Sequence, residues 1–297
     1  MYNKSFTLHI KNKIKPFKKV IEVDSDKSMS IRSFLISAIS HDISEVKNVL
    51  ESEDVLSCLN SLRKLGVKIL KIKNGEYKIY GKGLGCLSIN KNKTLDCGNS
   101  GTTARLIVGL LSTNPGIKVK ITGDSSLRKR NMSKLIELMT EFGATFYPLK
   151  KNHFPLTLVS SEMPIGIDYR AGVSAQLKSA VILAGLNSYG VTNILEEKKS
   201  RNHTENMLLK NSNVLKIKKN KKNQNHIKVF GKSYLNPLKI KINGDPSSAA
   251  FFTALTILNP KSSLRIKNVG LNQRRIGFYN LLKKYGANIK FKNLKKK

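Results

Sequence analysis

Residues 96–111 read DCGNSGTTARLIVGLL, a run of Gly, Ser and Thr that passes directly into an apolar stretch. Small residues let a backbone approach a ligand closely, and a Ser before an apolar run is a helix N-cap signal. The free N–H groups of a first helical turn attract anions, and the helix dipole adds to that attraction. We therefore predict a helix that begins near Gly101 with an anion site at its N-terminus.

The same arrangement recurs along the chain. Four segments place small polar residues before an apolar run, and they are 26–32, 98–103, 172–178 and 244–250. Measured between Lys27, Ser100, Ser174 and Ser247, the spacings are 73, 74 and 73 residues. A regular spacing of this kind indicates one supersecondary unit used several times.

A second helix is predicted in each unit. Three of these helices precede a glycine, which is a C-cap signal, and they span 52–65, 130–142 and 273–285. The third unit has a shorter counterpart, 202–210, without the glycine. Alternating stretches such as 117–121 and 226–230 are typical of half-buried strands. The repeating unit is therefore a mixed α/β module.

Length and composition indicate a globular protein with two domains, since the chain has 297 residues and is 40% hydrophobic. No apolar run approaches the roughly 20 residues that cross a bilayer, so we expect no membrane association. The basic N-terminus lacks the apolar core of a signal peptide. Cys58, Cys86 and Cys97 have neither metal nor disulfide spacing. We expect a cytoplasmic protein without a metal site.

The formal net charge of +35 raises the question of nucleic-acid binding. The charge comes mainly from lysines spread over the chain, whereas aromatic residues make up 7% and Trp is absent. Arginine recognises carboxylate and phosphate in a bidentate way. Seven of the ten arginines lie in the motif segments, namely Arg32, Arg105, Arg128, Arg130, Arg201, Arg274 and Arg275. We therefore expect a small anionic ligand rather than nucleic acid.

Taken in order, seven motifs resemble those of the 5-enolpyruvylshikimate-3-phosphate synthase family, the 3-phosphoshikimate 1-carboxyvinyltransferases. The motifs are DKSMSIR at 26–32, DCGNSGTTAR at 96–105, GDSSLRKR at 123–130, SAQLKS at 174–179, SRNHTE at 200–205, GDPSSAA at 244–250 and NVGLNQRRIG at 268–277. The resemblance covers essentially the whole chain, and the colinear order makes it specific.

The resemblance implies an α/β fold of the enolpyruvate-transferase type, with two domains built from repeated βαβαββ units as an inside-out α/β barrel. On that pattern residues 25–238 form a complete middle domain of three units. Residues 1–24 and 239–297 form part of the other domain, an N-terminal strand and one unit. The family pattern has six units and this sequence shows four, so we expect the second domain to be incomplete.

The resemblance also implies an activity, the transfer of the enolpyruvyl group of phosphoenolpyruvate to the 5-hydroxyl of shikimate 3-phosphate with release of phosphate. This reaction belongs to the shikimate pathway to chorismate and the aromatic amino acids, and it requires no cofactor. The family's catalytic Asp base has no counterpart here and is expected beyond residue 297. We therefore expect residues 1–297 alone to be inactive, and to act as a monomer or with a separately encoded C-terminal fragment.

The resemblance assigns two sets of substrate-binding residues. Shikimate 3-phosphate would be bound by Lys27, Ser28, Arg32, Ser174, Ala175, Gln176, Ser200 and Arg201. Phosphoenolpyruvate would be bound by Lys27, Asn99, Gly101, Thr102, Arg130 and Gln176. The roles of Arg105, Arg128 and His203 stay open. Asp124 and Asp168 are poor candidates for the base, and Asp245 with Ser247 is expected to cap a structural helix.

Two alternatives remain at this point. One is the related enolpyruvyl transferase that acts on a UDP-sugar, although its loop cysteine and uridine-site motifs have no counterpart here. The other is a non-catalytic, basic nucleic-acid-binding derivative of the family. The absence of a stacking motif beside the charged residues argues against the second alternative.

Overall fold

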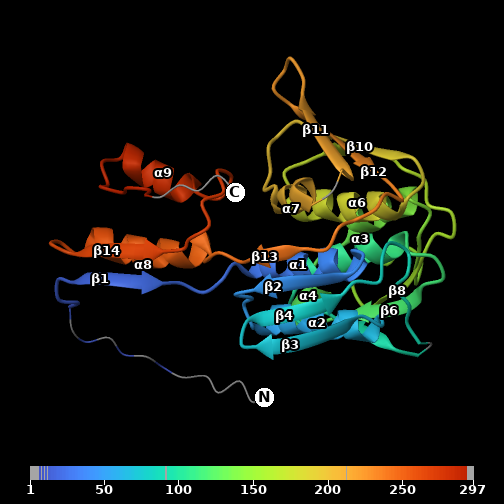
Figure 1. Ribbon diagram of the computed structural model, residues 1–297, viewed down its shortest axis with the longest axis horizontal. Helices are drawn as coiled ribbons and strands as arrows, with labels where there is room; N and C mark the ends of the chain where they lie inside the picture. The colour runs from blue at the N-terminus through green and yellow to red at the C-terminus, as the bar shows by residue number, and fades with distance from the viewer. Residues whose placement is uncertain are drawn as a thin grey trace. The chain divides into compact units, whose positions relative to one another are not determined.

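The computed structural model describes residues 7, 9, 11, 13–90, 92–211 and 213–292 (Figure 1). The chain divides into two compact units, one of Ser25–Asn243 and one of Met1–Asp24 with Gly244–Lys297. The sequence placed these boundaries at 24/25 and 238/239. The second boundary falls five residues later because a short strand in that stretch pairs within the larger unit.

The larger unit contains three repeats that share an order of elements, except that the first has no leading strand of its own and the second has an extra short helix. The first consists of α1 (Lys27–Ile39), β2 (Ile43–Lys47), α2 (Glu53–Lys64), β3 (Lys68–Lys73) and β4 (Glu76–Tyr80). The second consists of β5 (Thr94–Asp96), α3 (Gly101–Ser112), β6 (Lys118–Thr122), α4 (Ser125–Arg128), α5 (Ser133–Glu141), β7 (Thr145–Tyr147) and β8 (Leu156–Val159). The third consists of β9 (Asp168–Ala171), α6 (Ala175–Asn187), β10 (Val191–Glu196), α7 (His203–Asn211), β11 (Leu215–Lys219) and β12 (Asn225–Phe230).

Each repeat forms its own four-stranded sheet, and the strand order is the same in all three. With β13 (Lys239–Lys241) in the first sheet, the orders are β13-β2-β4-β3, β5-β6-β8-β7 and β9-β10-β12-β11. In each sheet the first two strands are parallel and the other neighbours are antiparallel. This common order confirms that the sequence repeat is a structural repeat.

The first repeat receives its first strand from a distant part of the chain. β13 (Lys239–Lys241) pairs in parallel with β2, with Lys239 opposite Glu45 and Lys241 opposite Lys47. The strand that precedes α1 in sequence, β1 (Lys18–Glu22), pairs instead with β14 (Ser263–Lys267) in the smaller unit. β1 therefore pairs with a strand of the C-terminal repeat and not with the first sheet.

Helices α1, α3 and α6 form the interior of the larger unit, and Figure 1 shows them between the first and third sheets. Each helix is buried around nearly its whole circumference; in α1 every residue from Ser30 to Ile39 is buried. A helix buried on all sides lacks the polar outer face of a surface helix, although Arg32 and Lys178 are among the buried residues of α1 and α6. Helices α2 and α5 bury one face only, which agrees with their polar outer residues.

The smaller unit contains β1, α8 (Pro246–Leu258), β14 and α9 (Gly277–Lys284). Asp245 caps α8, accepting a hydrogen bond from Ser247 N at 2.7 Å, and Arg275 Nη2 lies 2.6 Å from Asp245 Oδ1. The cap role predicted for this motif is confirmed. Among its described residues the buried core consists of Ala249, Ile276 and Tyr279.

The predicted helix ends agree with the structure better than the predicted starts. Gly66, Gly143 and Gly286 follow α2, α5 and α9 with positive φ, as C-cap glycines require. Two starts were placed too early: α5 begins at Ser133 rather than 130, and α9 at Gly277 rather than 273. In both cases an Asn side chain, Asn131 or Asn272, accepts from a backbone N–H two residues later and forms a turn first.

Candidate functional site

Three helix N-termini of the larger unit are each capped by a polar side chain. Asp26 accepts from Met29 N at 2.9 Å at the start of α1, and Ser100 accepts from Thr103 N at 3.2 Å at the start of α3. Ser174 accepts from Leu177 N at 3.3 Å at the start of α6. The remaining N–H groups of these first turns provide the positive end of each helix dipole.

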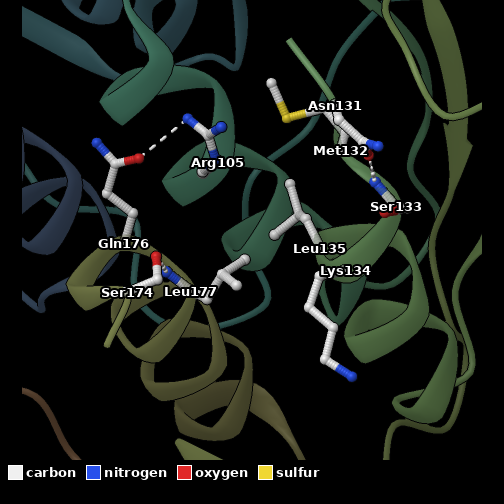
Figure 2. A pocket seen from close by; sticks show the side chains of 9 residues that line it. All are labelled: Arg105, Asn131, Met132, Ser133, Lys134, Leu135, Ser174, Gln176 and Leu177. Atoms are coloured by element: carbon white, nitrogen blue, oxygen red, sulfur yellow. Dashed lines mark hydrogen bonds between the residues drawn. The ribbon is translucent and has the colours of Figure 1, made fainter. Parts of the chain in front are cut away.

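Side chains of the first turns join α3 to α6. Gln176 Nε2 donates to Thr102 Oγ1 at 2.9 Å, and Arg105 Nη1 donates to Gln176 Oε1 at 3.0 Å. Figure 2 shows Arg105 and Gln176 facing each other. The amide of Gln176 therefore connects the N-terminal ends of two buried helices, and these ends lie side by side.

Arg32 joins α1 to the same region. Its Nη2 donates to Ser179 Oγ on α6 at 3.1 Å, and its Nη1 donates to Ser28 Oγ at 2.8 Å. Its Nε donates to Thr204 Oγ1 on α7 at 2.9 Å. A buried guanidinium held by three elements is a rigid cation, which suits recognition of a carboxylate or phosphate.

Gly101 lies against two guanidinium groups. A Cβ atom at this position would lie 2.5 Å from Arg130 Nη1 and 2.9 Å from Arg105 Nη1. Burial lowers the pKa of Arg105, and the neighbouring charge of Arg130 lowers it further. Two cations and the N-terminus of α3 in one place form a concentration of positive charge, which an anion would relieve.

Asn99 holds Arg130 in this arrangement. Its Oδ1 accepts from Arg130 Nη2 at 2.6 Å, and its Nδ2 donates to Asp124 Oδ2 at 2.7 Å. The Leu127 backbone N–H, together with the Asn99 amide, holds the pKa of Asp124 below its usual value. Asp124 therefore caps α4 and anchors Asn99.

A hollow of about 300 Å³ opens beside this region in the larger unit (Figure 2). It is lined by Arg105, by Ser174, Gln176 and Leu177 at the start of α6, and by residues 131–135 at the start of α5. Around the hollow, the N-terminus of α5 lies next to Ser174 and Gln176, which the sequence analysis assigned to substrate binding. Residues 132–135 carry no predicted role and were missed by the motif analysis.

Lys27 is the first residue of α1, where its charge opposes the helix dipole. Its Nζ lies 2.6 Å from Asp54 Oδ2 in the first turn of α2, and the Lys27 side chain is 48% exposed. Asp54 was not among the predicted residues, because nothing in its local sequence separates it from an ordinary N-terminal helix acid.

The remaining residues that the sequence singled out lie on α6, at or just before the start of α7, and in α4. Ala175 is buried at the start of α6, and Arg201 is exposed. Ser200 is buried, and its N and Oγ both donate to Glu196 Oε1, at 2.9 and 3.1 Å. His203 is the first residue of α7 and is buried, whereas Arg128 is exposed with its Nε donating to Gly123 O.

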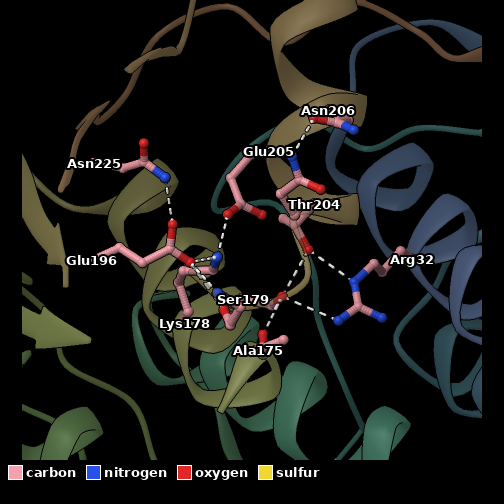
Figure 3. Close-up of polar contacts among 11 residues, drawn as sticks. Arg32, Ala175, Lys178, Ser179, Glu196, Thr204, Glu205, Asn206 and Asn225 are labelled. Atoms are coloured by element: carbon pink, nitrogen blue, oxygen red, sulfur yellow. Dashed lines mark hydrogen bonds and ion pairs between the residues drawn. The ribbon is translucent and has the colours of Figure 1, made fainter. Parts of the chain in front are cut away.

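Figure 3 shows a buried group that the sequence analysis did not anticipate. Lys178 Nζ lies 2.5 Å from Glu196 Oε1 and 2.6 Å from Glu205 Oε1. Burial alone would raise the pKa of Glu196, but the bonds from Lys178, Ser200 N and Asn225 outweigh it and lower the pKa to about 2. A lysine within the apolar run 177–186 was the available signal, because such a residue needs a partner.

Three further features of the described residues concern Asp168, membrane-spanning helices and metal sites. Asp168 Oδ1 accepts from Asn193 Nδ2 at 2.7 Å on the outer sheet, so it has a structural role. None of the helices in the described part of the chain is long and apolar enough to cross a bilayer. The described residues also contain no group of three or more His, Cys, Asp or Glu placed to hold a metal ion.

The fold and the site now permit comparison with known proteins. A solved structure, EPSP synthase from Acinetobacter baumannii, superposes with a TM-score of 0.81 and 35% identity over 92% of this chain. The fold is thus of the enolpyruvate-transferase type. The sequence pattern of the family EPSP synthase (3-phosphoshikimate 1-carboxyvinyltransferase) matches residues 11–296, and the chain belongs to this family.

Curated relatives agree with this assignment. The 3-phosphoshikimate 1-carboxyvinyltransferase of Parvibaculum lavamentivorans is 38% identical over 274 residues, which are 92% of this chain and 60% of the relative. That of Thermodesulfovibrio yellowstonii is 40% identical over 290 residues, which are 95% of this chain and 64% of the relative. The chain therefore spans a little under two thirds of the length of these relatives.

Proposed function

We propose that the larger unit binds shikimate 3-phosphate and phosphoenolpyruvate, and that the chain contributes to transfer of the enolpyruvyl group to the 5-hydroxyl of shikimate 3-phosphate. The observation that carries the proposal is that Arg32 and Gln176 connect the first two turns of α1, α3 and α6. Both substrates carry a phosphate and a carboxylate, which helix N-termini and arginines recognise.

The two substrates would occupy adjacent parts of this region. Shikimate 3-phosphate would contact Lys27, Ser28 and Arg32 of α1 and Ser174, Ala175 and Gln176 of α6, with Ser200 and Arg201 nearby. Phosphoenolpyruvate would contact Asn99, Gly101, Thr102 and Arg130. Lys27 and Gln176 would contact both substrates. Arg105, which bonds Gln176 and neighbours Arg130, would orient the two groups rather than bind alone.

Calorimetric titration of the chain with shikimate 3-phosphate tests this proposal. We expect binding at millimolar ligand or below. Arg32→Ala should weaken it about 10- to 100-fold, because charged hydrogen bonds contribute roughly 1.5–3 kcal/mol. Arg170→Ala is the matched control, since Arg170 is exposed on β9 in the same unit. A folded protein without detectable binding, or equal losses in both variants, would refute the proposal.

Turnover is a separate question from binding. General acid–base groups contribute about 10²- to 10⁴-fold to such reactions, and the carboxylates near the site, Asp54 and Asp124, are engaged with Lys27 and Asn99. We propose that the base comes from a polypeptide equivalent to the part of the relatives that this chain does not cover. Phosphate release should be absent with residues 1–297 alone and should appear when that polypeptide is added.

Three unpaired cysteines, Cys58, Cys86 and Cys97, support a proposed cytoplasmic location. Burial raises the pKa of the Cys97 thiol to about 12, with the nearby charge of Asp96 acting in the same direction, so this cysteine is not a nucleophile.

A further inference from the structure

The buried cluster of Lys178, Glu196 and Glu205 lies on three elements, α6, the end of β10 and α7 (Figure 3). None of the three side chains is more than 1% exposed. Buried ion pairs lose the solvation of both charges, and apolar residues of similar volume often stabilise a protein equally well. A contribution to stability therefore does not by itself explain why these charged residues are buried here. The residues that they contact indicate a second role.

Glu196 holds Ser200. One oxygen of its carboxylate accepts from the backbone N–H and the hydroxyl of Ser200, and the other accepts from Asn225 Nδ2 at 2.6 Å. The backbone that leaves β10 is thereby folded back onto the strand end, so Ser200 takes one position. Hydrogen bonds to an ionised acceptor are shorter and stronger than neutral ones, so this restraint is firm.

Glu205 holds the neighbouring Thr204. Its Oε1 bonds Lys178, and its Oε2 is buried without a hydrogen-bond partner among the described residues, so Lys178 is the contact that fixes it. Thr204 Oγ1 donates to Ser179 Oγ at 2.8 Å and accepts from Arg32 Nε. Lys178 and Ser179 are adjacent on α6, and Thr204 and Glu205 are adjacent on α7. The Lys178–Glu205 ion pair and the Ser179–Thr204 hydrogen bond therefore join the same two helices side by side.

We propose that Lys178, Glu196 and Glu205 are positioning residues for the ligand site. Glu196 fixes Ser200, Glu205 fixes Thr204 and through it the guanidinium of Arg32, and Lys178 holds both carboxylates. The inference rests on the proposed function only for the identity of the ligand, shikimate 3-phosphate. The positioning itself can be measured without any ligand.

The experiment compares Glu196→Gln and Glu205→Gln with Glu76→Gln in the full chain. Glu76 pairs with Lys73 at 3.3 Å on the surface, with side chains 28% and 69% exposed, so the control removes the same charge from an exposed pair. Hydrogen exchange by NMR is followed at Ser200 N–H, at Arg32 Nε–H and at backbone amides of α3. Shikimate 3-phosphate binding is measured by calorimetry on the same samples.

The two glutamates should affect different protons. Glu196→Gln should speed exchange at Ser200 N–H about tenfold or more, since one charged hydrogen bond contributes more than 1.4 kcal/mol. Glu205→Gln should speed exchange at Arg32 Nε–H by a similar factor and should leave Ser200 N–H protected. Exchange in α3 should stay unchanged in both variants. Each should bind shikimate 3-phosphate about tenfold more weakly, and Glu76→Gln should match the wild type.

Three results would overturn the inference. The first is exchange at Ser200 and Arg32 that is as slow in the glutamate variants as in Glu76→Gln. The second is faster exchange throughout α3, which would indicate general destabilisation. The third is unchanged binding of shikimate 3-phosphate despite faster exchange at these two residues. The variants are read independently, so one that does not fold leaves the other to decide. If the wild-type chain binds no shikimate 3-phosphate, the proposed function fails, and the exchange rates still decide the positioning role.

Discussion

Gly101 is constrained by side chains rather than by its own backbone. Its φ is not positive, so an alanine would adopt the same helical conformation, but the added Cβ would displace the guanidinium groups of Arg130 and Arg105. The motif around Gly101 was visible in the sequence as a run of small residues. The two arginines that make the glycine necessary are 4 and 29 residues away in sequence, and only the fold brings Arg130 to it.

Replacing Gly101 with Ala should therefore separate binding from folding. We expect phosphoenolpyruvate binding to weaken about tenfold or more, because two charge-assisted contacts move. The thermal midpoint should stay close to that of the wild type, since Ala favours helices by about 0.5–1 kcal/mol over Gly. Gly277→Ala is the control, because Gly277 also begins a helix and has open space where a Cβ would lie. Equal affinities in both variants would contradict the account.

The lowered pKa of Glu196 predicts how stability depends on pH. Its folded value of about 2 lies below its ordinary value of 4.5, so the folded state favours the ionised form. This contribution is complete above pH 4.5 and is lost as the pH falls toward 2. Between these limits the free energy of unfolding should decline less steeply in Glu196→Gln than in the wild type, as measured by urea unfolding. Parallel curves would show that the carboxylate is not held ionised.

At the scale of elements, local sequence predicted which segments are helices but not where each one begins. The glycines after α2, α5 and α9 mark helix ends because a positive φ is a local property. The first residues of the predicted helix 130–142 instead form a turn closed by Asn131, after the short helix α4 has ended at Arg128. Arg130, which precedes this turn, donates to Asn99 on a distant part of the chain, and a local pattern does not contain that contact.

The cap of α3 offers a direct test of an element in the site. Ser100 accepts from Thr103 N and donates to Thr103 Oγ1 at 2.8 Å, and it is buried. Ser100→Ala should lower the free energy of unfolding by about 1 kcal/mol, the usual cost of losing an N-cap. Ser125→Ala removes an exposed hydroxyl at the first residue of α4 and should change it little. Chemical denaturation of both variants measures this difference in the free energy of unfolding. Equal values for the two variants would contradict the prediction.

At the scale of the whole molecule, the sequence repeat predicted the architecture because 73-residue spacing reflects one packing unit. The repeat could not show that β13 completes the first sheet, since β1 stands in the equivalent sequence position. It also could not show that α8, which has no charged residue, exposes Phe251 by 79% and Leu258 by 81%. The larger unit alone therefore has the extended buried core on which a rigid ligand site depends.

The central claim is that the first turns of α1, α3 and α6 form one site for phosphorylated carboxylates. Titration of the isotopically labelled chain with shikimate 3-phosphate, followed by backbone NMR, tests this most directly. The account predicts that saturable shifts are confined to amides near Ser28, Ser174, Gln176 and Ser200, and that Arg32→Ala moves them to about 10- to 100-fold higher ligand concentration. Saturable shifts centred elsewhere, for instance on the lysine-rich β11 and β12, or no shifts at millimolar ligand, would contradict it.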